Sequence, residues 1–391
     1  MHKQKIGLYL GTEPNGGGTF QYNQAVLEAI AWLPREHYET VVAYSSKTML
    51  PYLDPLSVKI VYNPRPLISR LISFACRKLR IPLPIWRSIH SVIDPFARRL
   101  INESCDLWIF PSQDIFAYTI DVPSLGTIHD LMHRYEKQFE ELSANGEYEA
   151  REFHYRKMVG NARGVLVDSN VGKQQVLESY GIDESKIHVL PYIAPSYIYS
   201  NQMPKDFDQK YTLPSKFIFY PAQFWTHKNH IGLIRAASII KVDNPDFKLV
   251  FVGAMKNGYA LALDLVDELE LSSSIQFLGY VPDEDMPELY RRARAIVMPT
   301  FCGPTNIPPL EAFVTGCPLA VSRVYAMPEQ VGDAALLFDP RSSTDIARVL
   351  VELWNDNQLC EELSKKGKAR ADLFNPKVFN TDLLKIIQNI Q

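Results

Sequence analysis

A polar loop between an apolar strand and a helix is the part of the sequence best suited to chemistry. The strand is expected at Ala295–Met298, and the helix opens with Pro308 and Pro309. Proline is tolerated in a first helical turn because its missing N–H would have no partner there. The last backbone donors before the helix then belong to Thr305, Asn306 and Ile307. Free amides at the positive end of a helix dipole favour an anion site.

Glu311 lies about one turn inside the same helix and would repel a phosphate directly. A functional Glu311 would therefore accept hydrogen bonds from neutral hydroxyls such as a ribose diol, and the segment would then bind a nucleoside diphosphate. A carboxylate at this place also complements the positive end of a helix without any ligand. Both interpretations fit the segment equally well.

Three further groups follow expected strands, where parallel sheets present their ligand-binding edge. Gly16–Gly18 follows the first strand and would let the backbone approach a ligand, although a plain tight turn would also use glycine. His129 follows Ser124–Ile128 and is either a site histidine or a structural one. Lys228, in the segment QFWTHKNH, is either a compact cation that meets a phosphate or an exposed lysine beside a helix start.

Metal chemistry is not expected from this sequence. His129 and His133 are four residues apart, but no H-E-x-x-H motif accompanies them. The acidic triplet at 283–285 has the D-x-D form, yet it precedes a helical run, where acids favour the dipole, so capping is the preferred interpretation. The five cysteines form no C-x-x-C pair, which argues against zinc and disulfides and fits a reducing compartment. We expect no metal and no cofactor besides the substrate.

Alternating strands and helices must position these residues. Strands are expected at Ile6–Leu10, Thr40–Tyr44, Leu107–Phe110, Ser124–Ile128, Gly164–Val167, Ile187–Leu190, Phe217–Tyr220, Lys248–Val252, Ile275–Phe277, Ala295–Met298, Leu319–Val321 and Ala335–Phe338. Helices are expected at Asn23–Trp32, Val171–Tyr180, His230–Lys241, Leu261–Leu269, Met286–Arg292 and Thr344–Trp354. This alternation predicts an α/β fold with parallel sheets covered on both faces.

A length of 391 residues predicts two domains of ordinary size. Pro191–Lys216 holds four prolines and little periodicity, so we interpret it as the interdomain connection. We expect domains at 1–195 and 196–375, each a doubly wound parallel-sheet domain, facing each other across a cleft.

The composition excludes several classes of protein. With 46% hydrophobic and 22% charged residues and a net charge of −3, the chain is typical of a soluble globular protein, and no nucleic-acid binding is expected. No secretory h-region opens the chain, and no apolar stretch reaches the ~18–20 residues that cross a bilayer. We expect a cytoplasmic protein.

The segment from Arg65 to Leu100 is strongly basic. It holds eight basic residues and one acid, a net charge of +7, interleaved with apolar residues. Such a stretch favours contact with an anionic membrane surface, here the inner face of the plasma membrane, or with a lipid diphosphate. The alternative is a solvated helical face with an ordinary core side.

Several segments in order carry a family resemblance. They are the Gly-rich loop, T-I-H-D, VLVDSNVGKQQVLESYGIDESKIHVLPY, FIFYPAQFWTHKNH, IQFLGYVPDEDMPELYRRARAIVMPT and GPTNIPPLEAFVTGCP. The set resembles the retaining glycosyltransferases of family 4, over nearly the whole chain. The resemblance implies two facing Rossmann-like domains (the GT-B architecture), with the nucleotide-sugar donor in the second and the acceptor side in the first. It also implies metal independence and a last helix, within 376–391, that returns to the first domain.

The resemblance assigns roles to individual residues. Glu311 matches the second Glu of the E-x7-E motif, which holds the ribose, and Lys228 matches the diphosphate lysine. The remaining matches are Thr305, Asn306 and Ile307 for donor-contacting amides, Val281 for the loop at the base, His129 beside the transferred sugar, and Gly17 for the glycine that approaches the donor.

Two positions depart from the family pattern. Gly303 stands where the first Glu of E-x7-E would fall, and Gln223 stands where the usual diphosphate arginine would fall. GPTNIPPLEA therefore replaces the full motif, as in a recurring variant of the family. The sugar hydroxyls then lose one carboxylate, and the diphosphate depends more on Lys228 and the helix dipole. Removing an Arg fork loses charge-assisted bonds of roughly 1.5–3 kcal/mol each.

The implied function is transfer of a hexose, with retention, from a nucleotide-diphosphate sugar to a glycan or lipid-linked acceptor in polysaccharide biosynthesis. A UDP-glucose-like donor is favoured over GDP-mannose. A nucleotide-sugar epimerase or a glycogen-type phosphorylase on the same architecture is one alternative, and a catalytically weak nucleotide-binding family member is another, which Gly303 and Gln223 keep open.

Overall fold

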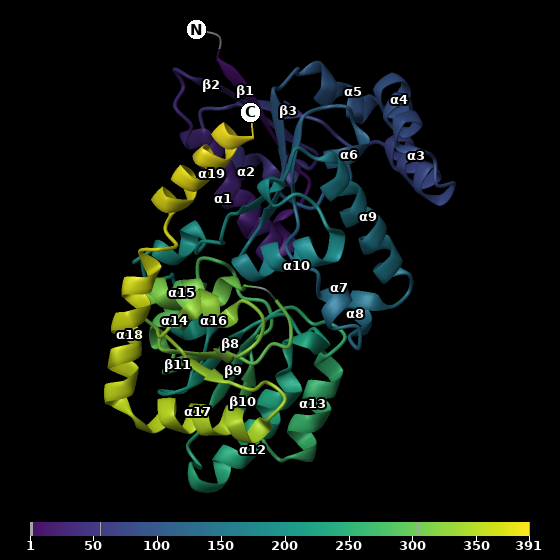
Figure 1. Ribbon diagram of the computed structural model, residues 1–391. Helices are drawn as coiled ribbons and strands as arrows, with labels where there is room; N and C mark the ends of the chain where they lie inside the picture. The colour runs from purple at the N-terminus through teal and green to yellow at the C-terminus, as the bar shows by residue number, and fades with distance from the viewer. Residues whose placement is uncertain (1–2, 55, 304, 391) are drawn as a thin grey trace. The chain divides into compact units, whose positions relative to one another are not determined.

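The chain forms two compact units, each built on one parallel sheet (Figure 1). The computed structural model describes residues 3–54, 56–303 and 305–390. The first unit comprises Met1–Leu131, Glu149–Pro191 and Pro376–Gln391, and the second comprises Met132–Tyr148 and Tyr192–Asn375. The α/β architecture expected from the sequence, with two doubly wound parallel sheets, is confirmed.

The first sheet has seven strands in the order β3-β2-β1-β4-β5-β6-β7, all paired in parallel. They are β1 (Gln4–Leu10), β2 (Tyr38–Tyr44), β3 (Lys59–Tyr62), β4 (Leu107–Phe110), β5 (Ser124–Thr127), β6 (Gly164–Val167) and β7 (Ile187–Val189). The strand order reverses between β1 and β4. In open parallel sheets ligands bind at such a switch point, beyond the carboxyl ends of the strands.

Helices cover both faces of this sheet. They are α1 (Gly18–Trp32), α2 (Leu50–Leu53), α3 (Leu67–Lys78), α4 (Leu83–Ile93), α5 (Pro95–Asn102), α6 (Phe116–Thr119), α9 (Glu147–Asn161), α10 (Asn170–Tyr180) and α19 (Pro376–Asn389), with 3-10 turns η1 (Pro14–Gly16), η2 (Lys47–Met49) and η3 (Glu184–Lys186). The last helix, α19, packs on α1, where the rings of Phe379 and Tyr22 lie 6.2 Å apart. Its buried face, including Leu383 and Ile387, thereby joins the end of the chain to the first unit.

The second sheet has six parallel strands in the order β10-β9-β8-β11-β12-β13. They are β8 (Ile218–Pro221), β9 (Leu249–Val252), β10 (Ile275–Phe277), β11 (Ala295–Met298), β12 (Leu319–Ser322) and β13 (Leu336–Phe338). The helical elements of this unit are α7 (Met132–Tyr135), α8 (Glu140–Ser143), η4 (Ser196–Tyr199), α11 (Phe207–Lys210), η5 (Thr226–Lys228), α12 (His230–Asp243), α13 (Tyr259–Glu268), α14 (Met286–Arg292), α15 (Ile307–Thr315), α16 (Met327–Val331), α17 (Ser343–Asn355) and α18 (Asn357–Ala371). Its switch point lies between β8 and β11.

Two stretches pack differently from the sequence-based expectation. Ile198 and Phe207, in the stretch interpreted as an interdomain connection, are buried in the core of the second unit. That stretch is therefore mostly part of the second unit, which resumes at Tyr192. Residues 132–148, expected in the first domain, belong to the second unit because Met132 and Leu142 pack with Cys302.

Among the described residues, no helix is both long and apolar enough to cross a membrane.

Candidate functional site

The polar loop after β11 leads into α15, as the sequence predicts. The helix begins at Ile307, with Asn306 at the N-cap in an extended conformation and no side-chain capping hydrogen bond. The three residues proposed as anion donors, Thr305, Asn306 and Ile307, are all buried or nearly so. The helix start is thus present at the carboxyl edge of the sheet, where open parallel sheets bind their ligands.

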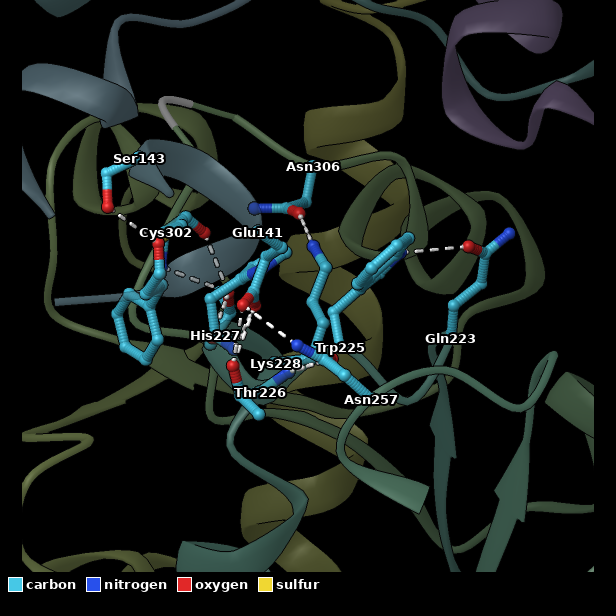
Figure 2. A network of polar contacts seen from close by, with 12 residues as sticks. Glu141, Ser143, Gln223, Trp225, Thr226, His227, Lys228, Asn257, Cys302 and Asn306 are labelled. Carbon is cyan, nitrogen blue, oxygen red and sulfur yellow. Dashed lines mark hydrogen bonds and ion pairs between the residues drawn. The ribbon is translucent and has the colours of Figure 1, made fainter. Parts of the chain in front are cut away.

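Lys228 and Asn306 lie together at this edge (Figure 2). Lys228 ends the short turn η5 after β8, and its Nζ donates to Asn306 Oδ1 over 3.1 Å. Its carbonyl oxygen accepts from the Tyr220 hydroxyl at 2.7 Å, which fixes the backbone of the turn. The structure therefore brings Lys228, the lysine predicted to bind a phosphate, to the N-terminus of α15.

The amide of Asn306 is not free, which corrects the expectation of an open donor. Asn306 N–H donates to Gln330 Oε1 at 3.1 Å, and Gln330 Nε2 donates back to Asn306 O at 2.6 Å. The Asn306 side-chain amide also contacts Met327 Sδ at 3.2 Å. A phosphate would reach the Asn306 amide only if Gln330 moved, so of the predicted amides this one is already satisfied within the protein.

Glu311 is buried and accepts from two tyrosines, which neither interpretation of the sequence anticipated. The hydroxyls of Tyr197 and Tyr290 each donate to one carboxylate oxygen of Glu311. Burial raises the pKa of Glu311 to about 7, against the lowering effect of the two hydroxyls, and the charge of Asp283 raises it further. Each carboxylate oxygen has a second lone pair, so a ribose diol could still be accepted if the tyrosines opened a path.

The backbone at Gly303 explains the missing first Glu of the E-x7-E motif. Gly303 has φ +109°, a conformation that residues with a side chain rarely adopt. A Cβ at this position would lie 2.6 Å from Asn306 Nδ2. Asn306 thus occupies the space that a side chain at 303 would need.

Gln223, at the position of the missing arginine, is engaged with its neighbour. Its Oε1 accepts from Trp225 Nε1 at 3.1 Å, as Figure 2 shows. Lys256 Nζ lies 5.0 Å from the centre of the Trp225 ring, so a cation does lie beside this loop.

Val281 is buried, and it follows Gly279, whose φ of +71° turns the chain after β10. Asp283, two residues further on, is close enough to Glu311 to raise the pKa of its carboxyl group. The loop assigned to the base and the residue assigned to the ribose therefore lie in the same part of the second unit.

A carboxylate that sequence analysis missed anchors the Lys228 turn. Glu141, from α8, accepts from Thr226 Oγ1 at 2.8 Å, from His227 N at 3.1 Å and Nδ1 at 2.8 Å, and from Asn257 Nδ2 at 3.0 Å (Figure 2). These hydrogen bonds hold the pKa of Glu141 well below its usual range despite its burial. Glu141 is separated from His227 by 86 residues, so no local sequence signal points to the pair.

In the first unit, His129 and Gly17 both lie at the carboxyl edge of the sheet. His129 Nε2 lies 2.9 Å from Pro111 O, and since a carbonyl only accepts, Nε2 carries the proton. Burial lowers the pKa of His129 to about 4, so the ring is neutral near pH 7. Gly17 is the N-cap of α1 with φ +60° and ψ −134°, a conformation that requires glycine.

No group of three or more His, Cys, Asp or Glu within 3–54, 56–303 and 305–390 could hold a metal ion. The acidic triplet lies directly before α14, as expected. Asp285 is the N-cap of α14 but makes no capping hydrogen bond. Instead it is fully buried and accepts from Tyr211 at 2.8 Å and from Lys210 at 3.2 Å, which fixes α11 against α14.

Residues 204–370 match the family described as glycosyl transferases group 1. This group 1 region contains Lys228, Val281, the 305–307 loop and Glu311, whereas Gly17, His129 and the basic segment lie outside it. The O-antigen chain mannosyltransferase B of Escherichia coli is 29% identical to this chain over 219 residues, which are 55% of this chain and 57% of the relative. The chain thus spans little more than half the length of that curated relative.

Solved structures agree over nearly the whole chain. A glycosyltransferase from Rickettsia africae aligns with a TM-score of 0.71 at 17% identity, covering 100% of this chain and 99% of the other. The Anabaena protein HepE, in complex with UDP and glucose, aligns with a TM-score of 0.74 at 16% identity, covering 98% and 99%. At these identities the likeness establishes the fold, which is the GT-B fold that the resemblance implied.

Proposed function

We propose that this protein is a retaining hexosyltransferase that uses a nucleoside-diphosphate sugar in the synthesis of an O-antigen-type polysaccharide. The observation that carries the proposal is the meeting of Lys228 with the N-terminus of α15 at the carboxyl edge of the second sheet, inside the group 1 region. A cation and a helix dipole converge there on one point, which is what a diphosphate requires. Family 4 is the subgroup proposed.

The chemistry follows from where charge develops. When the anomeric C–O bond breaks, negative charge grows on the leaving β-phosphate and positive charge on the sugar. Lys228 and the helix dipole of α15 would stabilise the phosphate, and Glu311 would hold the ribose. Retention would follow if the acceptor attacks from the same face, with the leaving phosphate helping to remove its proton. His129 and Gly17 would serve the sugar side, and no metal would be needed.

Two donors are proposed for test. The mannosyltransferase among the curated relatives supports a mannose donor such as GDP-mannose. The sequence analysis instead favours a UDP-hexose. The HepE complex holds UDP and glucose, but at 16% identity it bears on the fold alone. The acceptor proposed is a glycan or a lipid-linked glycan, and contact of residues 65–100 with an anionic membrane remains a prediction that flotation with anionic liposomes would test.

The experiment is slow hydrolysis of UDP-glucose and of GDP-mannose by the purified chain, followed by proton NMR. A retaining transferase releases the α-anomer first from an α-linked donor, before mutarotation. Release of the β-anomer first would contradict retention. An epimerase would instead yield the nucleotide linked to an inverted sugar, and a binding protein without activity would yield no free sugar above the rate of a Lys228→Ala control.

A further inference from the structure

A cavity of about 420 Å³ opens in the first unit, and its lining residues precede the group 1 region in the sequence. Its volume lies in the range of small-molecule sites. Arg65, Arg70 and Arg77 line it, together with Trp86, Asp114 and Tyr118. Three guanidinium groups against one carboxylate make it a cationic cavity with aromatic walls.

Two of the arginines lie on one face of α3, and the third, Arg65, lies in the segment just before this helix. Arg70 and Arg77 are seven residues apart on α3, so they project from the same face. Both are exposed, and among the described residues neither forms an ion pair or hydrogen bond with another side chain. Arg87, by contrast, does not line the cavity and is engaged by Tyr118 O at 3.0 Å and by Asp121 at 3.7 Å.

Arg65 supplies a third cation that is held in place. Its guanidinium lies 4.9 Å from the centre of the Phe116 ring, while its Nε is buried and has no hydrogen-bond partner in the described parts of the chain. Asp114, the only acid on the wall, likewise has a buried oxygen, Oδ2, without a partner. Burial raises the pKa of Asp114 to about 7, which weakens its opposition to an anion. Both residues line the cavity, and buried polar atoms without a partner call for an explanation such as a bound water or ion nearby.

The cavity lies at the ligand-binding edge of the sheet. Asp114 follows β4, and its Oδ1 lies 2.9 Å from where a Cβ of Gly11, just after β1, would be. This is the β1/β4 switch point. Gln113 beside it is held at φ +59°, an uncommon conformation for a residue with a side chain and one that clusters at functional sites.

An exposed apolar surface adjoins the cavity. On α3, Leu67 is 70% exposed and Leu71 is 56% exposed, and Phe74 continues the stripe onto the cavity wall. Ile85 on α4 is 53% exposed. Figure 1 shows α3 and α4 on the outer side of the first unit. Asp94 is the single acid in the basic segment 65–100. It is fully buried as the N-cap of α5, so its charge does not offset the arginines at the surface.

We propose that this arginine pocket binds the phosphate of an amphipathic phosphate ester, whose apolar chain lies on the exposed faces of α3 and α4. The ligand chemistry follows from the juxtaposition: three guanidinium groups fit a phosphate, and the apolar stripe fits a hydrocarbon chain rather than a sugar. Resting on the proposed function, the inference identifies this ester as the acceptor or its carrier.

The test is calorimetric titration of the full chain with farnesyl phosphate, farnesol and glucose 6-phosphate. Farnesyl phosphate should bind at least tenfold more tightly than either of the others. The variant Arg70→Gln/Arg77→Gln should lose at least tenfold in affinity for farnesyl phosphate. The matched variant Arg98→Gln/Arg99→Gln, which removes two exposed arginines of α5 outside the cavity, should keep the wild-type affinity.

If farnesol bound as tightly as farnesyl phosphate, the phosphate would not contribute to binding and the proposed phosphate site would be wrong. If glucose 6-phosphate bound more tightly, the proposed contact with a hydrocarbon chain would be wrong. An equal loss of affinity in both double variants would mean that the overall positive charge of the segment, and not the pocket, binds the phosphate. If a variant unfolds, the 31P signal of farnesyl phosphate bound to the wild-type chain decides instead. A bound signal that an equal amount of glucose 6-phosphate does not displace supports the proposal, and a signal that it does displace contradicts it. Titration with UDP and GDP separates the two proposals: nucleotide binding without farnesyl phosphate binding refutes only the pocket, and no nucleotide binding refutes the proposed function.

Discussion

Lys228 donates a hydrogen bond to Asn306 across 78 residues of sequence, and the two meet where α15 begins. The partner is a neutral amide oxygen, so the contact positions the ammonium group without cancelling its charge. An anion at this edge would meet the ammonium group of Lys228 together with the dipole of α15.

The neutrality of Asn306 is open to test. Asn306→Asp would place a carboxylate against Lys228 and oppose an incoming diphosphate, so binding of UDP or GDP should weaken at least tenfold, about 1.4 kcal/mol. Asn306→Ala keeps the lysine charge and should weaken binding less than Asn306→Asp. Calorimetric titration at constant ionic strength measures both. Equal losses in the two variants would mean that the charge at position 306 is unimportant.

The loop conformation at Gly303 predicts that the family carboxylate cannot simply be restored. Gly303→Glu must adopt φ near +109° with its Cβ 2.6 Å from Asn306 Nδ2, so we expect a loss of about 1–3 kcal/mol in the free energy of unfolding. Gly303→Glu/Asn306→Gly removes the obstruction and should recover part of the loss. Urea denaturation measures both, and a Gly303→Glu protein as stable as wild type would contradict this loop geometry.

Glu311 predicts a particular dependence of stability on pH. Its carboxyl group has a pKa of about 7 in the folded protein, raised from 4.5 mainly by burial. An acid with a raised pKa contributes most below its unfolded pKa, and the contribution is lost as pH rises through the folded value. Relative to Glu311→Gln, wild type should thus lose up to about 3 kcal/mol of stability between pH 4.5 and pH 8. Parallel stability curves for the two proteins would show that Glu311 titrates normally.

Glu141 predicts local order in the turn that carries Lys228. Its carboxylate accepts four kinds of donor from Thr226, His227 and Asn257, and hydrogen bonds to a charged group contribute roughly 1.5–3 kcal/mol each. Glu141→Gln should increase hydrogen exchange in η5 and in residues 132–148, measured by mass spectrometry. Glu140→Gln, one position earlier in α8, is the control. Unchanged exchange in the Glu141→Gln protein would rule out this anchoring role.

His129 should stay neutral over the physiological range. Its pKa is lowered to about 4 by burial, so its ring resonances should not titrate between pH 8 and about pH 5 in NMR spectra, with assignment by His129→Asn. Because a lowered histidine pKa favours the folded state above pH 6.5, this contribution is lost as pH falls through about 4. A midpoint near 6.5 would show that the ring is solvated rather than buried.

The sequence predicted the fold where the physics is local. Buried parallel strands are short continuous apolar runs, and β4, β6, β10 and β11 have the ends expected. The strand β3 was missed because its apolar run is only three residues long, and as an edge strand it leaves Ile60 and Tyr62 40% and 42% exposed. The helices α3, α4 and α5 were seen only as a basic amphipathic segment, not as separate elements.

The candidate site was predictable only in part, for the same reason. Strand ends and proline placement located Lys228 and the start of α15. The hydrogen-bond partners of the site residues are distant in sequence. Tyr197 is 114 residues from Glu311, and Gln330 is 24 residues from Asn306. The left-handed backbone at Gly303, and hence the reason for its departure from the family pattern, depends on Asn306 and is invisible without the structure.

The most direct measurement of the central claim is the affinity of wild type and of Lys228→Ala for UDP and GDP, with Lys205→Ala as an exposed control from the same unit. The account predicts that wild type binds one of the two nucleotides, that Lys205→Ala binds it equally well, and that Lys228→Ala binds it about 10- to 100-fold more weakly, the effect of one charge-assisted contact. Binding of neither nucleotide by wild type, or unchanged affinity in Lys228→Ala, would contradict it.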